Sequence, residues 1–135
     1  MALQYSVAVR NAQLDSFETT IGTTPILRIR SGAPPANCAA ARTGTVLATI
    51  NLPSDWMAAA SGGSKALSGT WQDTSADAAG TAGHFEVMDS SGTTCHMQGT
   101  VTATGGGGDM TLDNTSIAAG QQINITSFTI TAGNA

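Results

Sequence analysis

The stretch HFEVMDSSGTTCHMQGTVTA, residues 84–103, carries the clearest fold signal in the chain. Apolar and polar side chains alternate in both of its halves, and a period of two predicts strands with one buried face. The run at 89–93 consists of turn-forming residues, which predicts a hairpin between the two strands. With the loop centred on Ser91, Glu86 is expected to lie across from His96 on the outer face.

Short alternating segments continue on both sides of this hairpin and are separated by turn-forming residues. The phase of the last segment slips at 126–127, which predicts a β-bulge or bend there. About eight short strands with such spacing are typical of an antiparallel β-sandwich, either jelly-roll or immunoglobulin-like. We also expect a short helical turn at 55–60 and a loop at 73–82. The strand segments include residues 25–30, 45–52, 64–71, 84–88, 95–103, 110–112 and 122–131.

A helix is expected before the strands, because apolar residues recur near one helical face from Leu3 to Ile21. Ser6 is a suitable N-cap and Gly22 a suitable C-terminal stop, so the helix is predicted over residues 6–21. Two interpretations of its apolar face remain open. The helix covers an edge or face of its own sandwich, which we favour, or it is an arm that docks on a neighbouring subunit. We expect a single domain over 1–135, with the β-sandwich at 25–131.

The composition excludes several classes of function. Of the 135 residues only 10% are charged, and the net charge is −4. Nucleic-acid binding requires clustered Lys and Arg, so no nucleic-acid partner is expected. The sequence shows neither a signal-peptide pattern nor a membrane-span pattern, so we expect a soluble protein made in a cytoplasm. Cys38 and Cys95 are therefore expected to be free thiols rather than a disulfide.

Candidate chemical sites are weak. His84, Cys95 and His96 form the one metal-ligand grouping, but adjacent strand residues point to opposite faces and a third ligand is missing. No Gly-x-Ser-x-Gly motif is present, and the glycine run at 105–108 lacks the residues of a phosphate or Ca²⁺ loop. We therefore predict no enzyme activity, no cofactor and no metal.

A set of short strings, spread over almost the whole chain, resembles a family of small structural proteins of tailed bacteriophages and prophages. These strings carry no catalytic residues. The resemblance implies a virion component and therefore synthesis in the cytoplasm of a bacterial host. The strings are VRNA at 9–12, ETTIG at 18–22, LRI at 27–29, SGAPP at 31–35, LPSDW at 52–56, GTAGHF at 80–85 and GDMTL at 108–112.

Within that family, the function we expect is capsid decoration. A decoration (cement) protein would bind the major capsid protein on the outer lattice, as a homo-oligomer and most simply a trimer, and would stabilise the shell through many repeated contacts. The first alternative is a tail, collar or head-fibre component that binds other virion proteins. The second is a carbohydrate-binding module, for which Trp56 and Trp71 are the candidate aromatic residues.

The residues expected to contact a partner lie outside the strands of the sandwich or on its charged edge. Loops on a rigid scaffold commonly carry binding, and the longest is the run at 31–44, followed by the tip at 105–108 and the helix. The predicted protein-contact residues are Arg28, Arg30, Pro34, Pro35 and Trp56.

Overall fold

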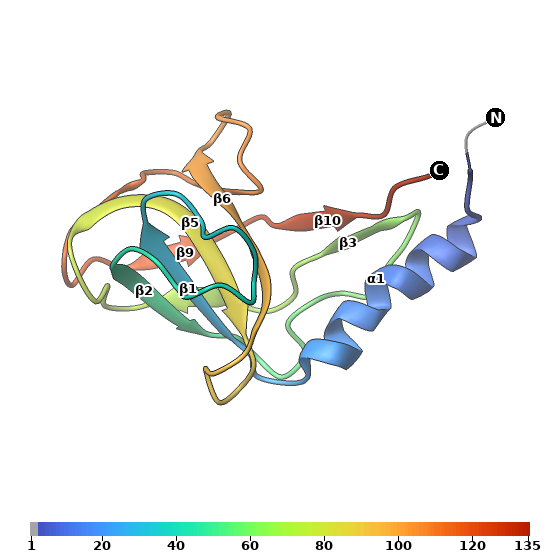
Figure 1. The fold of residues 1–135 in the computed structure, drawn as a ribbon, viewed down its shortest axis with the longest axis horizontal. Helices are drawn as coiled ribbons and strands as arrows, with labels where there is room; N and C mark the ends of the chain where they lie inside the picture. The colour runs from blue at the N-terminus through green and yellow to red at the C-terminus, as the bar shows by residue number, and fades with distance from the viewer. Residues whose placement is uncertain (1–2) are drawn as a thin grey trace.

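The computed structural model describes residues 3–135 and is mainly β, with one helix at its N-terminal end (Figure 1). Its curled sheets form a β-sandwich-like body, so the predicted fold class is confirmed. The elements are α1 Val7–Ile21, β1 Ile26–Ser31, β2 Val46–Asn51, β3 Ser64–Ala66, β4 Trp71–Asp73, β5 Gly80–Met88, β6 Cys95–Ala103, β7 Met110–Leu112, β8 Ser116–Ile117, β9 Ile123–Ile125 and β10 Thr129–Thr131.

The largest sheet has the strand order β2-β1-β5-β6-β7, and β8 also pairs with β5. Its pairs are antiparallel except for β6 and β7, which run parallel. The strands β4 and β9 form a second, two-stranded sheet. Apolar side chains of both sheets meet in one core, which includes Leu27, Ile29, Val87, Trp71 and Ile125.

The β5–β6 hairpin agrees with the predicted faces from Met97 onward but not in its register, and Cys95, expected on the core face, lies on the outer face next to Arg42 and Cys38. Phe85 lies opposite Gly99 and Val87 opposite Met97, whereas Glu86 lies opposite Gln98 and not His96. The register shifts between Val87 and Met88, where an irregularity interrupts the ladder. The predicted pairing of Glu86 with His96 is therefore wrong by two residues.

The loop of this hairpin is held by one carboxylate. Asp89 Oδ1 accepts hydrogen bonds from Thr93 N at 2.9 Å, Thr94 N at 3.3 Å and Ser91 Oγ at 2.9 Å. These donors favour the ionised carboxylate, with the Thr93 amide as the main cause, and they lower the pKa of Asp89 to about 2. The loop is thus closed by Asp89, as its turn-forming sequence indicates.

Helix α1 begins and ends as predicted. The Ser6 hydroxyl accepts a hydrogen bond from Val9 N, which satisfies one of the free amides of the first turn. Gly22 ends the helix with φ at 91°, a conformation that favours glycine, and its amide bonds to Glu18 O. The helix packs on its own chain, as the favoured interpretation has it, but not on an edge or face of the sandwich.

The helix packs instead on the two-stranded ribbon of β3 and β10, and the three elements form an arm that projects from the sandwich (Figure 1). We call this unit, residues 5–21, 58–66 and 129–134, the arm. Lys65 of β3 is 1% exposed, and its ammonium bonds to Asp15 Oδ1 at 2.7 Å and Glu18 Oε1 at 2.6 Å of the helix. Ion pairing from a buried lysine therefore holds the helix on the ribbon.

The pKa of this lysine records the balance of two opposing effects. Burial alone would lower the pKa of Lys65, but hydrogen bonds and charge from Asp15 and Glu18 outweigh it and raise the pKa above its ordinary value. The same contact lowers the pKa of Asp15, mainly through the hydrogen bond from Lys65. Lys65 is therefore charged at neutral pH despite its burial.

Aromatic rings join the arm to the sandwich. The ring centroids of Trp56 and Trp71 are 6.1 Å apart, and Phe128 lies 5.7 Å from Trp71 and 5.5 Å from Phe85. The Trp56 indole donates to Gly22 O at 3.1 Å, which ties the end of the helix to this cluster. The junction is thus part of the hydrophobic core rather than a flexible linker.

Two segments that were predicted as single strands each form two strands in different sheets, because the chain crosses between the arm and the sandwich inside each segment. Residues 64–71 form β3 of the arm and β4 of the sandwich, with Gly69 between them at φ 72°. Residues 122–131 likewise form β9 and β10, so the predicted bulge is a change of sheet.

Smaller predictions near these strands were wrong. Residues 55–60 form no helical turn; Met57 makes an isolated bridge with Leu67 instead. Strand β5 starts at Gly80, inside the predicted loop, and β8 was not expected. Within residues 3–135, no helix combines the length and the apolar character that crossing a membrane requires.

Candidate functional site

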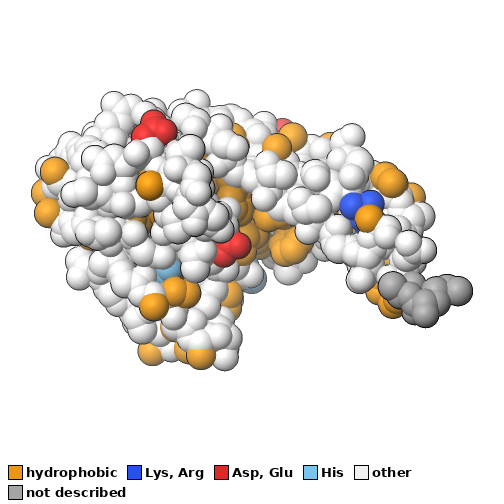
Figure 2. Space-filling model, turned by 90° about the horizontal axis from the view of Figure 1, so that it is seen from above, with side chains coloured by type: hydrophobic (Ala, Val, Ile, Leu, Met, Phe, Trp, Pro, Cys, Tyr) orange, Lys and Arg blue, Asp and Glu red, His pale blue; other side chains and the backbone are white. Residues whose placement is uncertain are grey.

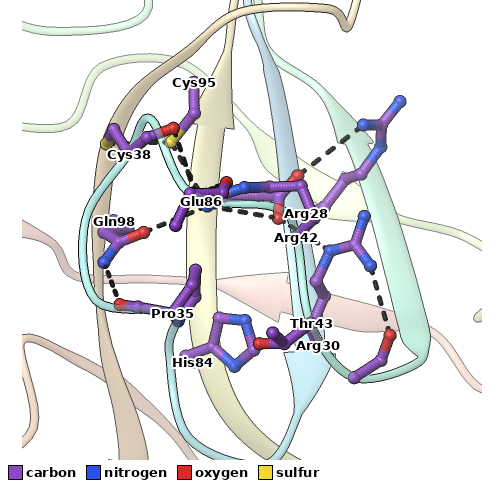
Figure 3. A network of polar contacts seen from close by, with 12 residues as sticks. Arg28, Arg30, Pro35, Cys38, Arg42, Thr43, His84, Glu86, Cys95 and Gln98 are labelled. Atoms are coloured by element: carbon purple, nitrogen blue, oxygen red, sulfur yellow. Dashed lines mark hydrogen bonds and ion pairs between the residues drawn. The ribbon is translucent and has the colours of Figure 1, made fainter.

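A buried carboxylate lies at the centre of the outer face of the main sheet. Glu86 of β5 is 0% exposed, and its Oε1 accepts a hydrogen bond from Arg30 Nε of β1 at 2.7 Å (Figure 3). Arg28 Nη1 lies 3.7 Å from Oε2 and Arg42 Nη1 lies 3.9 Å from Oε1. Three of the chain's five Lys and Arg residues therefore surround one acid. We call these four residues the Glu86 cluster.

The Glu86 cluster holds down the loop at 32–44. Arg42 donates to the carbonyl oxygens of Asn37, Cys38 and Ala40 at 2.8, 3.1 and 2.9 Å, so one guanidinium organises the turn of the loop. From β6, Gln98 Nε2 donates to Pro35 O at 2.8 Å (Figure 3). The loop is therefore ordered by side chains of the sheet rather than by ladder hydrogen bonds.

His84 adds a second buried contact under the same loop. It is 0% exposed, and its Nδ1 lies 2.9 Å from Gly32 O, so Nδ1 carries the proton and donates it. Gly83 beside it approaches the loop so closely that a Cβ there would lie 2.1 Å from Gly32 O. The His84 side chain thus anchors the loop through Nδ1 and lies out of reach of the surface.

Two polar atoms in this region have no hydrogen-bond partner, His84 Nε2 and Glu86 Oε2. The second of these still has a charge partner, because Arg28 Nη1 is 3.7 Å away, beyond hydrogen-bond length but within ion-pair range. The residues that the structure describes contain no group of three His, Cys, Asp or Glu side chains able to hold a metal ion.

The predicted contact residues divide into two places. Arg28 and Arg30 belong to the Glu86 cluster, Pro35 lies beside it through its bond with Gln98, and Pro34 precedes Pro35 in the same loop; all four are partly exposed. Trp56 lies elsewhere, at the junction of arm and sandwich, and is 1% exposed. Its indole cannot meet a partner at the surface, so that prediction fails, because the residue closes the core next to Gly22.

A thiol pair links the loop to β6. Cys38 and Cys95 are free thiols, and the Cys95 Sγ lies 2.9 Å from the Cys38 Sγ (Figure 3). Burial is the main cause that raises the pKa of Cys95 to about 12, and the neighbouring Cys38 adds to it. Since the sequence places these residues 57 positions apart, only the loop's folded path brings them together.

An apolar hollow lies between the arm and the sandwich, and sequence reasoning did not find it. Figure 2 shows hydrophobic side chains gathered there, where the surface turns inward beneath the arm. The hollow has a volume of about 790 Å³ and is open to solvent. We call it the arm hollow. The larger apolar residues that line it include Leu14, Phe17, Phe85, Met97, Phe128 and Ile130, and polar residues such as Gln13, Gln98 and Asp109 share the lining.

Phe17 gives the arm hollow its exposed aromatic edge. The predicted apolar face of the helix included this residue, but it is 37% exposed because the helix packs on the narrow ribbon and not on the sandwich. Val7 and Val9 of the same helix are also exposed, at 49% and 46%. The helical periodicity of the apolar residues is the sequence signal for this face of the helix. It leads to the expectation that the face is buried against the sandwich, whereas the structure packs the helix on the β3–β10 ribbon.

The described residues thus provide two surfaces that could bind a partner. One is the partly exposed Glu86 cluster with the loop at 32–44, and the other is the arm hollow. The Glu86 cluster carries two more positive charges than negative ones within an acidic protein, which suits contact with an acidic surface. The arm hollow suits an apolar side chain or segment of another protein. No protein-family model matches the chain, and neither a curated protein nor a solved structure matches it significantly.

Proposed function

We propose that this protein is a structural component of a tailed-phage virion, and specifically a capsid decoration protein that binds the outer capsid lattice. The observation that carries the proposal is the arm hollow, an apolar concavity rimmed by the exposed Phe17. Exposed apolar concavities on rigid scaffolds are typical of protein–protein contact sites. The short strings that resemble small phage structural proteins supply the virion context.

The fold suits a part that bridges neighbours. The sandwich has a continuous core, while the arm extends from it and is fastened by aromatic packing at the junction. A projecting and rigid arm reaches a second surface without a large ordering cost on binding. We therefore propose the major capsid protein as partner, with self-association into a trimer through the arm.

The charged side chains are consistent with a structural role. Glu86 and Lys65 are both buried, and each forms ion pairs within the chain. His84 is likewise used to anchor a loop. These groups stabilise the fold, so the surface that remains for binding is mostly small, polar and apolar. Such a surface favours many weak contacts repeated over a lattice.

The first experiment is the copy number of the chain in purified virions, measured by quantitative mass spectrometry against the major capsid protein. A ratio near one per capsid subunit supports capsid decoration. A count of a few copies to a few dozen refutes it and favours the tail, collar or head-fibre alternative. Absence from the particle refutes both.

A second experiment tests the arm hollow itself. Phe17→Asp places a charge at its rim, and Ala12→Asp places the same charge on an exposed helix position outside it. Phe17→Asp is expected to lose at least about tenfold in affinity for capsids that lack the protein, equal to about 1.4 kcal/mol. Ala12→Asp is expected to bind as the wild type does. Equal loss in both variants, or in neither, contradicts a contact through the arm hollow.

The burial of both tryptophans argues against the carbohydrate-binding alternative. Such modules present aromatic rings on their surface, and the two tryptophans considered for this role, Trp56 and Trp71, are each 1% exposed. Both indoles donate to backbone carbonyls within the core. Their side chains are therefore part of the junction and provide no platform for a sugar ring.

A further inference from the structure

We propose that Cys38 and Cys95 are a reversible oxidation site, and that their disulfide locks the loop at 32–44 onto strand β6. The two sulfur atoms already lie 2.9 Å apart in the reduced protein. A disulfide bond requires about 2.05 Å, so the sulfurs must approach by only about 0.9 Å. Cys38 lies in a loop, where small side-chain and backbone rotations provide that movement.

The surroundings of the pair orient both thiols for this reaction. Arg42 binds the Cys38 carbonyl at 3.1 Å, so it holds the backbone of the loop at the position from which Cys38 faces β6. The same guanidinium lies 3.5 Å from Cys95 Sγ, and Cys95 also contacts Met97 O at 3.4 Å. Both residues are partly exposed, so a small oxidant reaches them without unfolding the sheet.

The reaction is a two-step thiol–disulfide exchange with a low-molecular-weight disulfide such as oxidised glutathione. The Cys38 thiolate attacks one sulfur of glutathione disulfide and releases one glutathione thiolate. Cys95 loses its proton to solvent, attacks the Cys38 sulfur and releases the second glutathione thiolate. Two electrons pass from the cysteine pair to the oxidant, and the two released glutathione thiolates take up the two protons. Cys38 is the first nucleophile because the high pKa of Cys95 leaves little of its thiolate at neutral pH.

The cross-link changes how the loop is held. In the reduced protein, hydrogen bonds from Arg42 and Gln98 retain the loop, and these can open one at a time. A covalent bond from Cys38 to β6 removes that freedom and fixes the segment that carries Pro34 and Pro35. The loop is therefore held by hydrogen bonds alone in a reducing compartment and by an additional covalent bond in an oxidising medium.

The test uses the purified full chain, equilibrated with a series of ratios of oxidised to reduced glutathione. After acid quenching, free thiols are alkylated and the intact mass is measured. With excess oxidised glutathione, both thiols are expected to become resistant to alkylation, and the intact mass is expected to fall by the mass of two hydrogen atoms. The product is expected to be monomeric and to carry no persistent glutathione adduct. A reductant is expected to restore both thiols. Hydrogen exchange of the Ala39 and Ala40 amides is expected to slow in the oxidised form.

Single-cysteine variants provide the control. Cys95→Ser leaves Cys38 without its partner, so this variant is expected to accumulate a glutathione adduct that the wild type resolves. Cys38→Ser retains Cys95, whose scarce thiolate is expected to react slowly. The proposal is overturned if the wild type keeps stable glutathione adducts, forms disulfide-linked dimers, or retains both thiols under excess oxidant.

Discussion

Replacing Glu86 by glutamine removes the carboxylate around which three arginines are arranged, while it keeps the size and shape of the side chain. Glu86 is 0% exposed, so water cannot replace the lost charge. Its hydrogen bond with Arg30, at 2.7 Å, is charge-assisted and contributes about 2 kcal/mol. The two longer ion pairs, with Arg28 and Arg42, contribute roughly 0.5 kcal/mol each because those guanidinium groups are partly solvated.

The expected loss for Glu86→Gln is therefore about 3 kcal/mol, at the lower end of the range for breaking a buried ion pair. For a domain of 135 residues, that loss lowers the midpoint of thermal unfolding by about 10 °C. Differential scanning calorimetry measures the midpoint, and urea unfolding measures the free energy. The loop at 32–44 is also expected to exchange its amide hydrogens faster, because Arg42 loses its counter-charge.

Glu18→Gln is the matched control, since it makes the same chemical change at a partly exposed ion pair. Lys65 keeps Asp15 as a partner in that variant, so the expected loss is about 1 kcal/mol or less. If Glu86→Gln costs no more than Glu18→Gln, the Glu86 cluster does not stabilise the fold and the reasoning is refuted. A double-mutant cycle of Glu86→Gln with Arg30→Gln should give a coupling of at least about 1 kcal/mol.

Two further predictions concern the loop and the arm. Gly83→Ala is expected to destabilise the protein by about 2–3 kcal/mol in urea unfolding, because the added Cβ would lie 2.1 Å from Gly32 O. In the control Gly133→Ala the added Cβ meets nothing within 4 Å, so the free energy of unfolding should change by less than about 0.5 kcal/mol. Equal effects of the two substitutions would contradict the close approach of Gly83 to the loop. Because the folded-state pKa of Asp15 is lowered from 3.8, its ion pair with Lys65 contributes fully above pH 3.8 and is lost as the pH falls through the folded value. The protection of the α1 amides, taken relative to the intrinsic exchange rate at each pH, should therefore fall in acid, and Asp15→Asn should remove that part of the pH dependence; an unchanged protection profile in Asp15→Asn would refute the assignment.

The sequence predicts those parts of the fold that depend on neighbouring residues. The helix is bounded by Ser6 and Gly22, whose capping roles are readable from the residue types alone. The faces of β5 and β6 follow from alternation. The register of the same hairpin does not, because the shift between Val87 and Met88 depends on how Asp89 closes the loop.

The arm could not be predicted from local pattern. Its ribbon pairs β3 with β10, so Lys65 lies opposite Ile130, a residue far along the chain. From the alternation pattern alone, β3 and β4 look like one strand, and so do β9 and β10. Nothing in residues 64–71 or 122–131 indicates that the chain leaves one sheet and enters another. The arm hollow needs the helix, β6 and β10 together, so its existence is a property of the assembled fold.

The sequence predicts where some of the candidate site residues lie, and their contact with a partner stays a prediction. The alternation of residues 25–30 predicts that Arg28 and Arg30 point away from the core, and in the structure both lie around Glu86. The acid between them was not selected, because a buried glutamate at a strand position that reads as solvent-facing has no signal in one sequence. Trp56 was misplaced for the opposite reason, since a tryptophan beside a proline and an aspartate looks like a loop residue.

The pairing of β10 with β3 also determines the order in which the arm can assemble during synthesis. Helix α1 is made first, whereas its ribbon is complete only when Thr131 has been translated. At 5–20 residues per second, the ribosome needs roughly 5–20 s to pass from the end of the helix to the end of β10. Throughout that interval the helix is without its complete docking surface, so the nascent chain must remain unaggregated with Leu14 and Ile21 uncovered. The charged and polar residues of the helix, among them Arg10, Asp15 and Glu18, keep it amphipathic while uncovered rather than apolar on every side.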